Sequence, residues 1–138
     1  MPTGSTSRTI VVPKASKAAY DRLHYAPATR VGDMVWVSGQ VGIDAQSRPG
    51  QGIVAQAELA FENLKAVLAE AGASLGDVVD LMTFHIDLKG DVQAFGAVKD
   101  RYFRSHYPSW TAVGTTELAF DGLLVEIRAV AVVGSSPV

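Results

Sequence analysis

Residues 123–133 read Leu-Leu-Val-Glu-Ile-Arg-Ala-Val-Ala-Val-Val, and this stretch decides the fold class. Its odd-numbered side chains are all apolar, and most of its even-numbered side chains are apolar as well. Successive side chains of a strand point to opposite faces of a sheet, so both faces of this strand are partly apolar. Such a strand needs cover on both faces. The stretch therefore predicts a strand within a sheet that has a packed layer on each side.

Two segments with helical periodicity can supply one of those layers. Across residues 53–71 the apolar residues fall on one face, and Gly72 can cap the C-terminus because it tolerates positive φ. Residues 92–104 carry a second apolar stripe, and Asp91 can cap its N-terminus. Two helices cover one face of a sheet, so another copy of the chain is the simplest cover for the other face.

Alternating and β-branched residues predict the remaining strands at residues 9–12, 34–38, 78–88 and 110–118. Residues 14–30 have neither helical nor strand periodicity and are interpreted as an ordered loop. The order β-β-α-β-α-β-β favours an α+β fold in which one mixed sheet carries both helices on one face.

One domain is expected over residues 9–134, between a disordered N-terminus at residues 1–8 and a tail at residues 135–138. The chain has 138 residues, no cysteine and a net charge of −2. Disulfides and thiolate chemistry are thereby excluded. Without a basic stripe, nucleic acid is not the expected partner. No signal peptide or membrane span is apparent, so a cytoplasmic protein is expected.

The histidines give no sign of a metal site. His24, His85 and His106 are the only three, and they are not at ligand spacing. No strand–glycine loop–helix unit of a phosphate site is present either. The chain is therefore expected to use neither a metal nor an organic cofactor.

Glu126 is the most informative charged residue, because it interrupts an apolar run. One interpretation is a cross-strand ion pair with Arg128 or another cation. The other is a carboxylate that holds a water in a cleft. Ser38 and Gly39 similarly form either a simple turn or a place where a ligand approaches the backbone closely.

Three segments taken together resemble the Rid (YjgF) family of reactive-intermediate deaminases. They are GDMVWVSGQ at residues 32–40, A-x-x-x-FENLKAVL at residues 57–68 and VEI-x-AVA at residues 125–131. The resemblance implies a chorismate-mutase-like fold and a homotrimer with a central β-barrel. It also implies small-molecule clefts between subunits, where deaminating members hydrolyse 2-imino or 2-enamino acids without a cofactor.

The resemblance also implies site residues. Tyr25 corresponds to a tyrosine that lines the cleft, and Ser38 and Gly39 correspond to residues of the cleft floor. Glu126 corresponds to the glutamate that positions the attacking water.

The chain departs from the family pattern at the substrate-binding arginine, which follows a proline as Pro-x-Arg-Ser. Residues 108–111 read Pro-Ser-Trp-Thr, so Trp110 stands at the arginine position. Ala112 replaces a common cysteine, and Gly96 replaces an asparagine. Tryptophan lacks the planar fork that binds a carboxylate through two hydrogen bonds. Losing such a pair costs about 2–5 kcal/mol, or roughly 10²–10³-fold or more in kcat/KM.

The leading hypothesis is a Rid-family protein that binds a small imine or enamine in inter-subunit clefts, with weak or no activity on standard 2-imino acids. If the protein is an enzyme, it is expected to be a cofactor-free deaminase or hydrolase that acts on C=N bonds. Glu126 would be catalytic, and Tyr25 and Trp110 would shape the pocket for a more aromatic and less carboxylate-dependent ligand. Ser38, Gly39 and Ala112 complete the predicted set of binding residues.

Two alternatives stay open. One is a true 2-iminopropanoate deaminase in which Arg30 or Arg128 replaces the missing arginine. The other is a non-catalytic trimer that binds small molecules or acts like a chaperone. The scattered basic residues give little support to an RNA-cutting activity, which is sometimes attached to this family.

Overall fold

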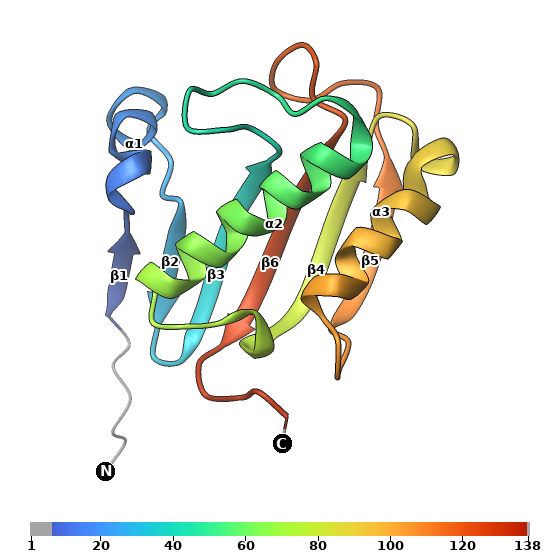
Figure 1. Ribbon diagram of the computed structural model, residues 1–138. Coiled ribbons are helices and arrows are strands. Elements are labelled where there is room, and N and C mark those ends of the chain that lie inside the picture. The colour runs from blue at the N-terminus through green and yellow to red at the C-terminus, as the bar shows by residue number, and fades with distance from the viewer. Residues whose placement is uncertain (1–6, 138) are drawn as a thin grey trace.

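The computed structural model describes residues 7–137, and in this range one mixed sheet is packed against helices (Figure 1). The strands are β1 (Arg8–Val11), β2 (Ala28–Val31), β3 (Met34–Val41), β4 (Val78–His85), β5 (Ser109–Gly114) and β6 (Val125–Val132). The helices are α1 (Lys17–Leu23), α2 (Gly52–Glu70) and α3 (Leu88–Tyr102). The prediction of an α+β fold with a mixed sheet is confirmed.

The strand order across the sheet is β1-β2-β3-β6-β4-β5. Only the β4–β5 pair is parallel among the pairs of this sheet, and the others are antiparallel. Strand β6, which corresponds to the predicted strand at residues 123–133, lies between β3 and β4.

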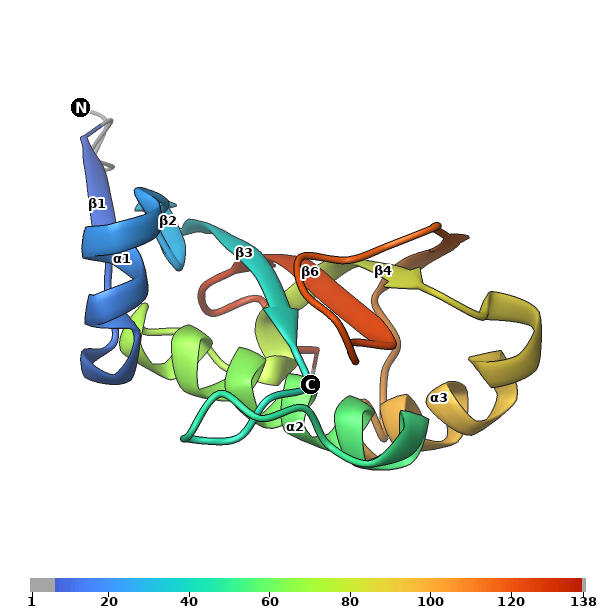
Figure 2. The same cartoon turned by 90° about the horizontal axis from the view of Figure 1, so that it is seen from above.

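Helices α2 and α3 lie on the same side of the sheet, and in Figure 2 no helix of the described part of the chain covers the opposite side. We call that opposite side the open face. The core lies between α2 and the sheet, where Phe61, Leu64 and Leu68 meet Val125 and Ile127, all with no exposed surface. The alternate residues of β6, which include Glu126 and Arg128, are on the open face and remain partly or fully exposed.

The prediction of a loop at residues 14–30 is wrong, because this segment contains α1 and most of β2. Helix α1 has seven residues and buries none of them, so its sequence carries no apolar stripe. Strand β2 follows Pro27 and has only four residues, too few for a clear alternation.

The two largest differences in boundaries from the prediction concern α3 and β5. Helix α3 begins at Leu88 instead of residue 92, since Asp87 is its N-cap and accepts a hydrogen bond from the Gly90 amide (3.2 Å). Asp91 therefore lies in the first turn of the helix. Strand β5 ends at Gly114 instead of residue 118, where its pairing with β4 ends at His85.

The two chain ends fall partly outside the described residues. Of the segment expected to be disordered, residues 1–6 lie outside the description, whereas Arg8 belongs to β1. Of the expected tail, residue 138 lies outside, whereas Ser136 donates through its amide and its hydroxyl to Asp77 Oδ1 (3.1 and 3.0 Å). No helix of residues 7–137 combines the length and apolarity needed to cross a bilayer.

Candidate functional site

The candidate site is built around a β-bulge in β3. Val37 pairs with Ala129 and Gln40 pairs with Ile127, so Ser38 and Gly39 together face the single residue between those partners on β6. A bulge bends its strand and redirects the side chains beside it. The Ser38–Gly39 pair predicted to be functional is therefore also the place where the β3–β6 ladder is interrupted.

Glu126 lies directly beside this bulge. A Cβ added to Gly39 would fall 2.6 Å from the carboxyl carbon of Glu126, closer than atoms that are not bonded can approach. The absence of a side chain at Gly39 thus makes room for the carboxylate. Cross-strand pairing with Val41 and Phe84 fixes the backbone of Glu126 on both sides.

The environment of Glu126 is less favourable than water for the charged form of its carboxyl group. Burial raises the pKa of Glu126 above its ordinary value, because the charged form loses solvation. Within residues 7–137 no lysine, arginine or histidine forms an ion pair with this carboxylate. The alternative of an ion pair between Glu126 and Arg128 or another cation is thus not found in this part of the chain, and Arg128 lies on the same strand as Glu126.

Ser38 connects the bulge to the loop that carries Tyr25. Its hydroxyl donates to the Ala26 carbonyl (2.6 Å), and its amide donates to the Pro27 carbonyl (2.9 Å). Tyr25 itself is exposed and precedes these two residues. The two predicted site positions are therefore held in one local unit, although the Ser38 hydroxyl already has a protein partner.

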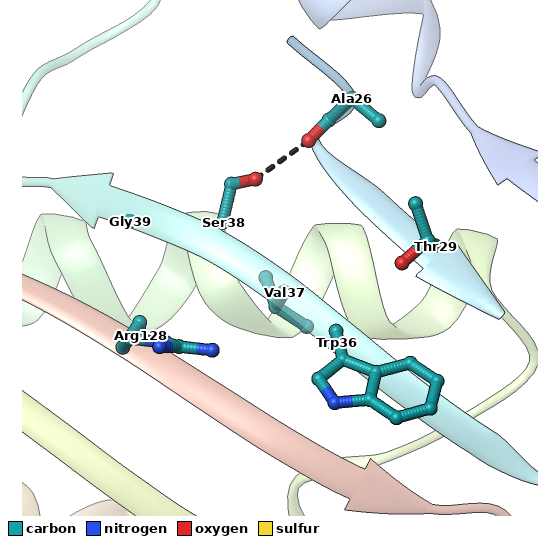
Figure 3. A pocket seen from close by; sticks show the side chains of 7 residues that line it. All are labelled: Ala26, Thr29, Trp36, Val37, Ser38, Gly39 and Arg128. Carbon is teal, nitrogen blue, oxygen red and sulfur yellow. Dashed lines mark hydrogen bonds between the residues drawn. The ribbon is translucent and has the colours of Figure 1, made fainter.

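An open pocket of about 290 Å³ lies over the bulge on the open face (Figure 3). Its lining consists of Ala26, Thr29, Trp36, Val37, Ser38, Gly39 and Arg128. The predicted residues Ser38 and Gly39 thus form part of its wall. Trp36 was missed as a site residue, although a large aromatic side chain on a strand face beside Ser-Gly was a usable signal. Thr29 was missed together with β2.

Arg128 and Arg30 differ in their freedom to bind a ligand. Arg30 donates to the Gly32 carbonyl (2.8 Å) and to the Ala71 carbonyl after the end of α2 (2.9 Å), and it also contacts Asp33 (3.4 Å). Its donors are therefore used to hold the helix end. The exposed side chain of Arg128 points into the pocket (Figure 3), and no carboxylate of residues 7–137 pairs with it.

Trp110 and Ala112 belong to the other side of the sheet within one chain. In the β4–β5 register they lie beside Leu81 and Thr83, which are buried on the helix side. The Trp110 Nε1–H donates to the Thr83 hydroxyl (3.0 Å). Within one chain these two positions are thus not brought together with Glu126 and the bulge.

The remaining positions show no metal site. In residues 7–137 no group of three or more histidine, aspartate or glutamate side chains is arranged to hold a metal ion.

Gly96 lies on α3, and a Cβ added there would meet nothing within 4 Å. The glycine at this position is therefore not required by packing.

Comparison with known proteins identifies similar chains. The family model described as Endoribonuclease L-PSP matches residues 16–133. The RutC family protein YjgH of Escherichia coli is 40% identical over 125 residues, which cover 90% of this chain and 94% of that protein. A solved structure of protein YjgH has a TM-score of 0.82 at 38% identity, covering 91% of this chain and 96% of the other.

Two further relatives have names or structures that bear on chemistry. A protein of Dermatophagoides farinae named 2-iminobutanoate/2-iminopropanoate deaminase is 34% identical over 111 residues, covering 79% of this chain and 85% of that protein. The crystal structure of E. coli TdcF with bound serine has a TM-score of 0.73 at 31% identity, covering 78% of this chain and 87% of the other.

Proposed function

Because this chain belongs to the Endoribonuclease L-PSP family, which includes the YjgF and RutC proteins, we propose that it binds and hydrolyses a small imine or enamine. Water adds to the C=N carbon to give a carbinolamine, which then releases ammonia or an amine and leaves a carbonyl compound. This reaction consumes one water and needs no oxidant or reductant.

The observation that carries the proposal is the unpaired carboxylate of Glu126 beside Gly39. A general base must lie within hydrogen-bond reach of the water that it activates. Glu126 sits on a central strand, which holds its position more firmly than a loop would. Its raised pKa makes it a better proton acceptor when ionised, and the same group can return the proton to the leaving nitrogen.

Relatives support this class of reaction. The mite protein named as a 2-iminobutanoate/2-iminopropanoate deaminase shares about a third of its aligned residues with this chain. TdcF, named a putative reactive intermediate deaminase, is 34% identical over 112 residues, and its crystal structure contains serine. A small metabolite is consistent with the volume of the pocket at the bulge, about 290 Å³.

The proposed substrate differs from the standard 2-imino acids. Trp110 cannot form the bidentate hydrogen bonds that a guanidinium gives to a carboxylate. We therefore expect weak turnover of 2-iminopropanoate and a preference for a ligand with a larger apolar or aromatic part. Tyr25 and Trp110 would provide the apolar walls of the cleft.

A trimer is part of this proposal. The open face carries Trp36, Met82, Phe84, Val130 and Val132, which are half-buried or exposed in one chain. Packing three such faces together would remove apolar surface from water. Trp110 lies on the helix side of edge strand β5, so a cleft at this edge of the sheet would bring it together with Tyr25 of a neighbouring subunit.

A second candidate function is favoured by Arg128. This side chain lines the pocket at the bulge, is unpaired within the described residues and has the fork that Trp110 lacks. The protein would then be a true 2-iminopropanoate deaminase with its cation on β6. Rapid turnover of 2-iminopropanoate that is lost in Arg128→Met would select this candidate.

The proposal is tested with imines generated in situ by an amino-acid oxidase. Each imine is followed with and without this protein, and with the Glu126→Gln variant as the matched control. We expect faster release of the keto product for at least one imine, and no acceleration by the variant. A panel in which no imine responds, combined with measurable ligand binding, would leave a non-catalytic binding trimer as the better function.

A further inference from the structure

One cation of α3 lies on the side of the helix that packs against the sheet. The buried residues of α3 are Phe95, Val98 and Lys99, and the Lys99 side chain is only 9% exposed. A buried ammonium loses solvation, which an apolar side chain at this position would not. Lysine stems usually carry the charged head out to water. The inward position of Lys99 is therefore costly unless the charge is used.

Aromatic rings fix the Lys99 ammonium at the outer edge of the sheet. Its Nζ lies 4.7 Å from the ring centroid of Trp110 and 6.0 Å from that of Tyr107. Cations are attracted to the negative face of such rings. Trp110 is itself held by its bond to Thr83 and by ring contact with Phe95, with centroids 6.0 Å apart. The charge thus has a defined place beside edge strand β5.

The protein supplies only a weak anionic partner for this charge. Lys99 Nζ lies 3.0 Å from Asp100 Oδ1. Neighbouring residues of a helix do not face each other, and the Asp100 side chain is 65% exposed. Because water solvates the exposed Asp100 carboxylate, this carboxylate compensates the Lys99 charge only weakly. A carboxylate brought by a ligand could therefore replace that of Asp100 at low cost.

We propose that Lys99, held over Trp110, is a specificity-determining residue that binds the carboxylate of a ligand whose flat, unsaturated or aromatic body lies against Trp110 and Tyr107. Tyr107 is exposed and Trp110 is 37% exposed, so both rings can be reached. This inference rests on the proposed function only in taking Trp110 to face the ligand.

The proposal revises the expectation of a less carboxylate-dependent ligand. An ammonium is a compact charge without the planar fork of a guanidinium. It recognises an anion but does not fix the plane of the carboxylate, so the aromatic walls must orient the ligand. The ligand class is therefore a planar carboxylate larger than 2-iminopropanoate.

Benzoate and its uncharged isostere benzamide test this site. The chain has two tryptophans, so a ¹H–¹⁵N spectrum contains two indole signals, and Trp36→Phe identifies the signal of Trp110. We expect benzoate to shift the Trp110 signal and benzamide to bind more weakly by about tenfold or more, as for loss of a charge-assisted contact. Added salt should weaken the binding of benzoate and not that of benzamide.

Variants of Lys99 separate a ligand contact from a packing role. Lys99→Met should reduce benzoate binding to the level of benzamide while leaving the melting temperature equal or higher, because a buried charge is removed. Lys99→Arg should retain the preference for benzoate. Lys89→Met is the matched control, since Lys89 is an exposed lysine on the same helix, and it should bind benzoate like the unaltered protein.

Three results would overturn the inference. They are equal binding of benzoate and benzamide, unchanged benzoate binding in Lys99→Met, and a shift of the Trp36 signal alone. If Lys99→Met does not fold, the benzoate–benzamide comparison in the unaltered protein decides. The readout is binding and not turnover, so loss of imine hydrolysis with benzoate binding intact would refute the proposed function alone.

Discussion

The carboxylate of Glu126 occupies the space in which a side chain at position 39 would otherwise lie, so Gly39 and Glu126 act as one structural unit. Gly39 is not among the positive-φ glycines of the described residues. An alanine at position 39 therefore brings no backbone strain, and its effect should come from contact with the carboxylate.

Gly39→Ala should lower the rate of imine hydrolysis and leave the fold intact. The new methyl group would displace the end of the Glu126 side chain, and a displacement of about 1 Å can cost on the order of 10²-fold in rate. The measurement is kcat/KM on the best imine of the panel, with circular dichroism as the check on folding. Gly96→Ala is the control, because a Cβ added there meets nothing within 4 Å. Full activity in Gly39→Ala would show that the carboxylate position is unimportant.

Glu126→Gln should preserve the fold and reduce turnover by about 10²–10⁴-fold, the usual range for a general base. Because burial raises the pKa of Glu126, the acid limb of the rate profile should lie above the ordinary range of a glutamate. The rate should fall as the pH falls through this raised pKa, since the base must be ionised. A variant with full activity would contradict the catalytic role and favour a binding protein.

The raised pKa of Glu126 also lowers the stability of the folded protein at neutral pH. A carboxyl whose folded-state pKa is raised destabilises the fold once the pH exceeds its unfolded value, because the ionised form is disfavoured in the folded state. Glu126→Gln should therefore be at least as stable as the unaltered protein at neutral pH. Thermal unfolding measures this, and a marked loss of stability would indicate a structural role for the charge.

The periodic elements of the fold were predictable and the others were not. Helix α2 and strand β6 carry long apolar patterns that their packing requires, so the sequence located them within a few residues. Helix α1 buries no residue, and β2 has four residues, so neither leaves a pattern to detect. The start of α3 was displaced because two aspartates compete as N-cap, and the contact with the Gly90 amide decides for Asp87.

The candidate site was predictable only in part. The sequence indicates which residues belong to the site, but the face of the sheet on which each side chain lies depends on how the strands pair. Ser38, Gly39 and Glu126 were identified from the sequence, and the last two lie together at the bulge. The bulge itself cannot be seen in the sequence, since it depends on how two distant strands pair. For the same reason the sequence could not show that Trp110 points to the helix side, where Lys99 meets it.

The protein should be a trimer in solution, because the open face is largely apolar and uncovered within one chain. Light scattering coupled to size exclusion should give three times the chain mass at micromolar concentration. Val130→Asp should shift the equilibrium between trimer and monomer towards the monomer, since Val130 lies half-buried on the open face. Ala69→Asp, on an exposed position of α2, is the control. A stable monomer of the unaltered protein would refute the inter-subunit site.

His85 should make the fold sensitive to mild acid. It is fully buried, its Nε2 lies 2.8 Å from the Thr83 hydroxyl, and its Nδ1 has no partner within residues 7–137. Desolvation lowers the pKa of His85, and the charge of Asp91 opposes this only in part. The unfolded state therefore takes up the proton first, so stability is present above the ordinary histidine pKa and lost as the pH falls towards the folded value.

The test compares melting temperatures at pH 7.5 and 5.5. His85→Gln should melt lower than the unaltered protein at pH 7.5 but lose less on acidification. His24→Asn is the control, because His24 is exposed and has a positive φ that asparagine tolerates. An equal loss in His85→Gln and the unaltered protein would exclude His85 as the source of the acid sensitivity.

Restoring the missing arginine should fail unless Lys99 is changed as well. In Trp110→Arg the new guanidinium would lie close to the ammonium that now lies 4.7 Å from the Trp110 ring, and the bond to Thr83 would be lost. Like charges repel, so the single variant should gain little activity on 2-iminopropanoate. Trp110→Arg combined with Lys99→Met removes the repulsion and should raise kcat/KM by about tenfold or more over the unaltered protein. A semicarbazide-competition assay measures all three proteins. Rapid turnover of 2-iminopropanoate by the unaltered protein would refute the expectation of weak activity on this substrate. If Trp110→Arg alone were as active as the double variant, charge repulsion by Lys99 would not limit the activity of the new arginine.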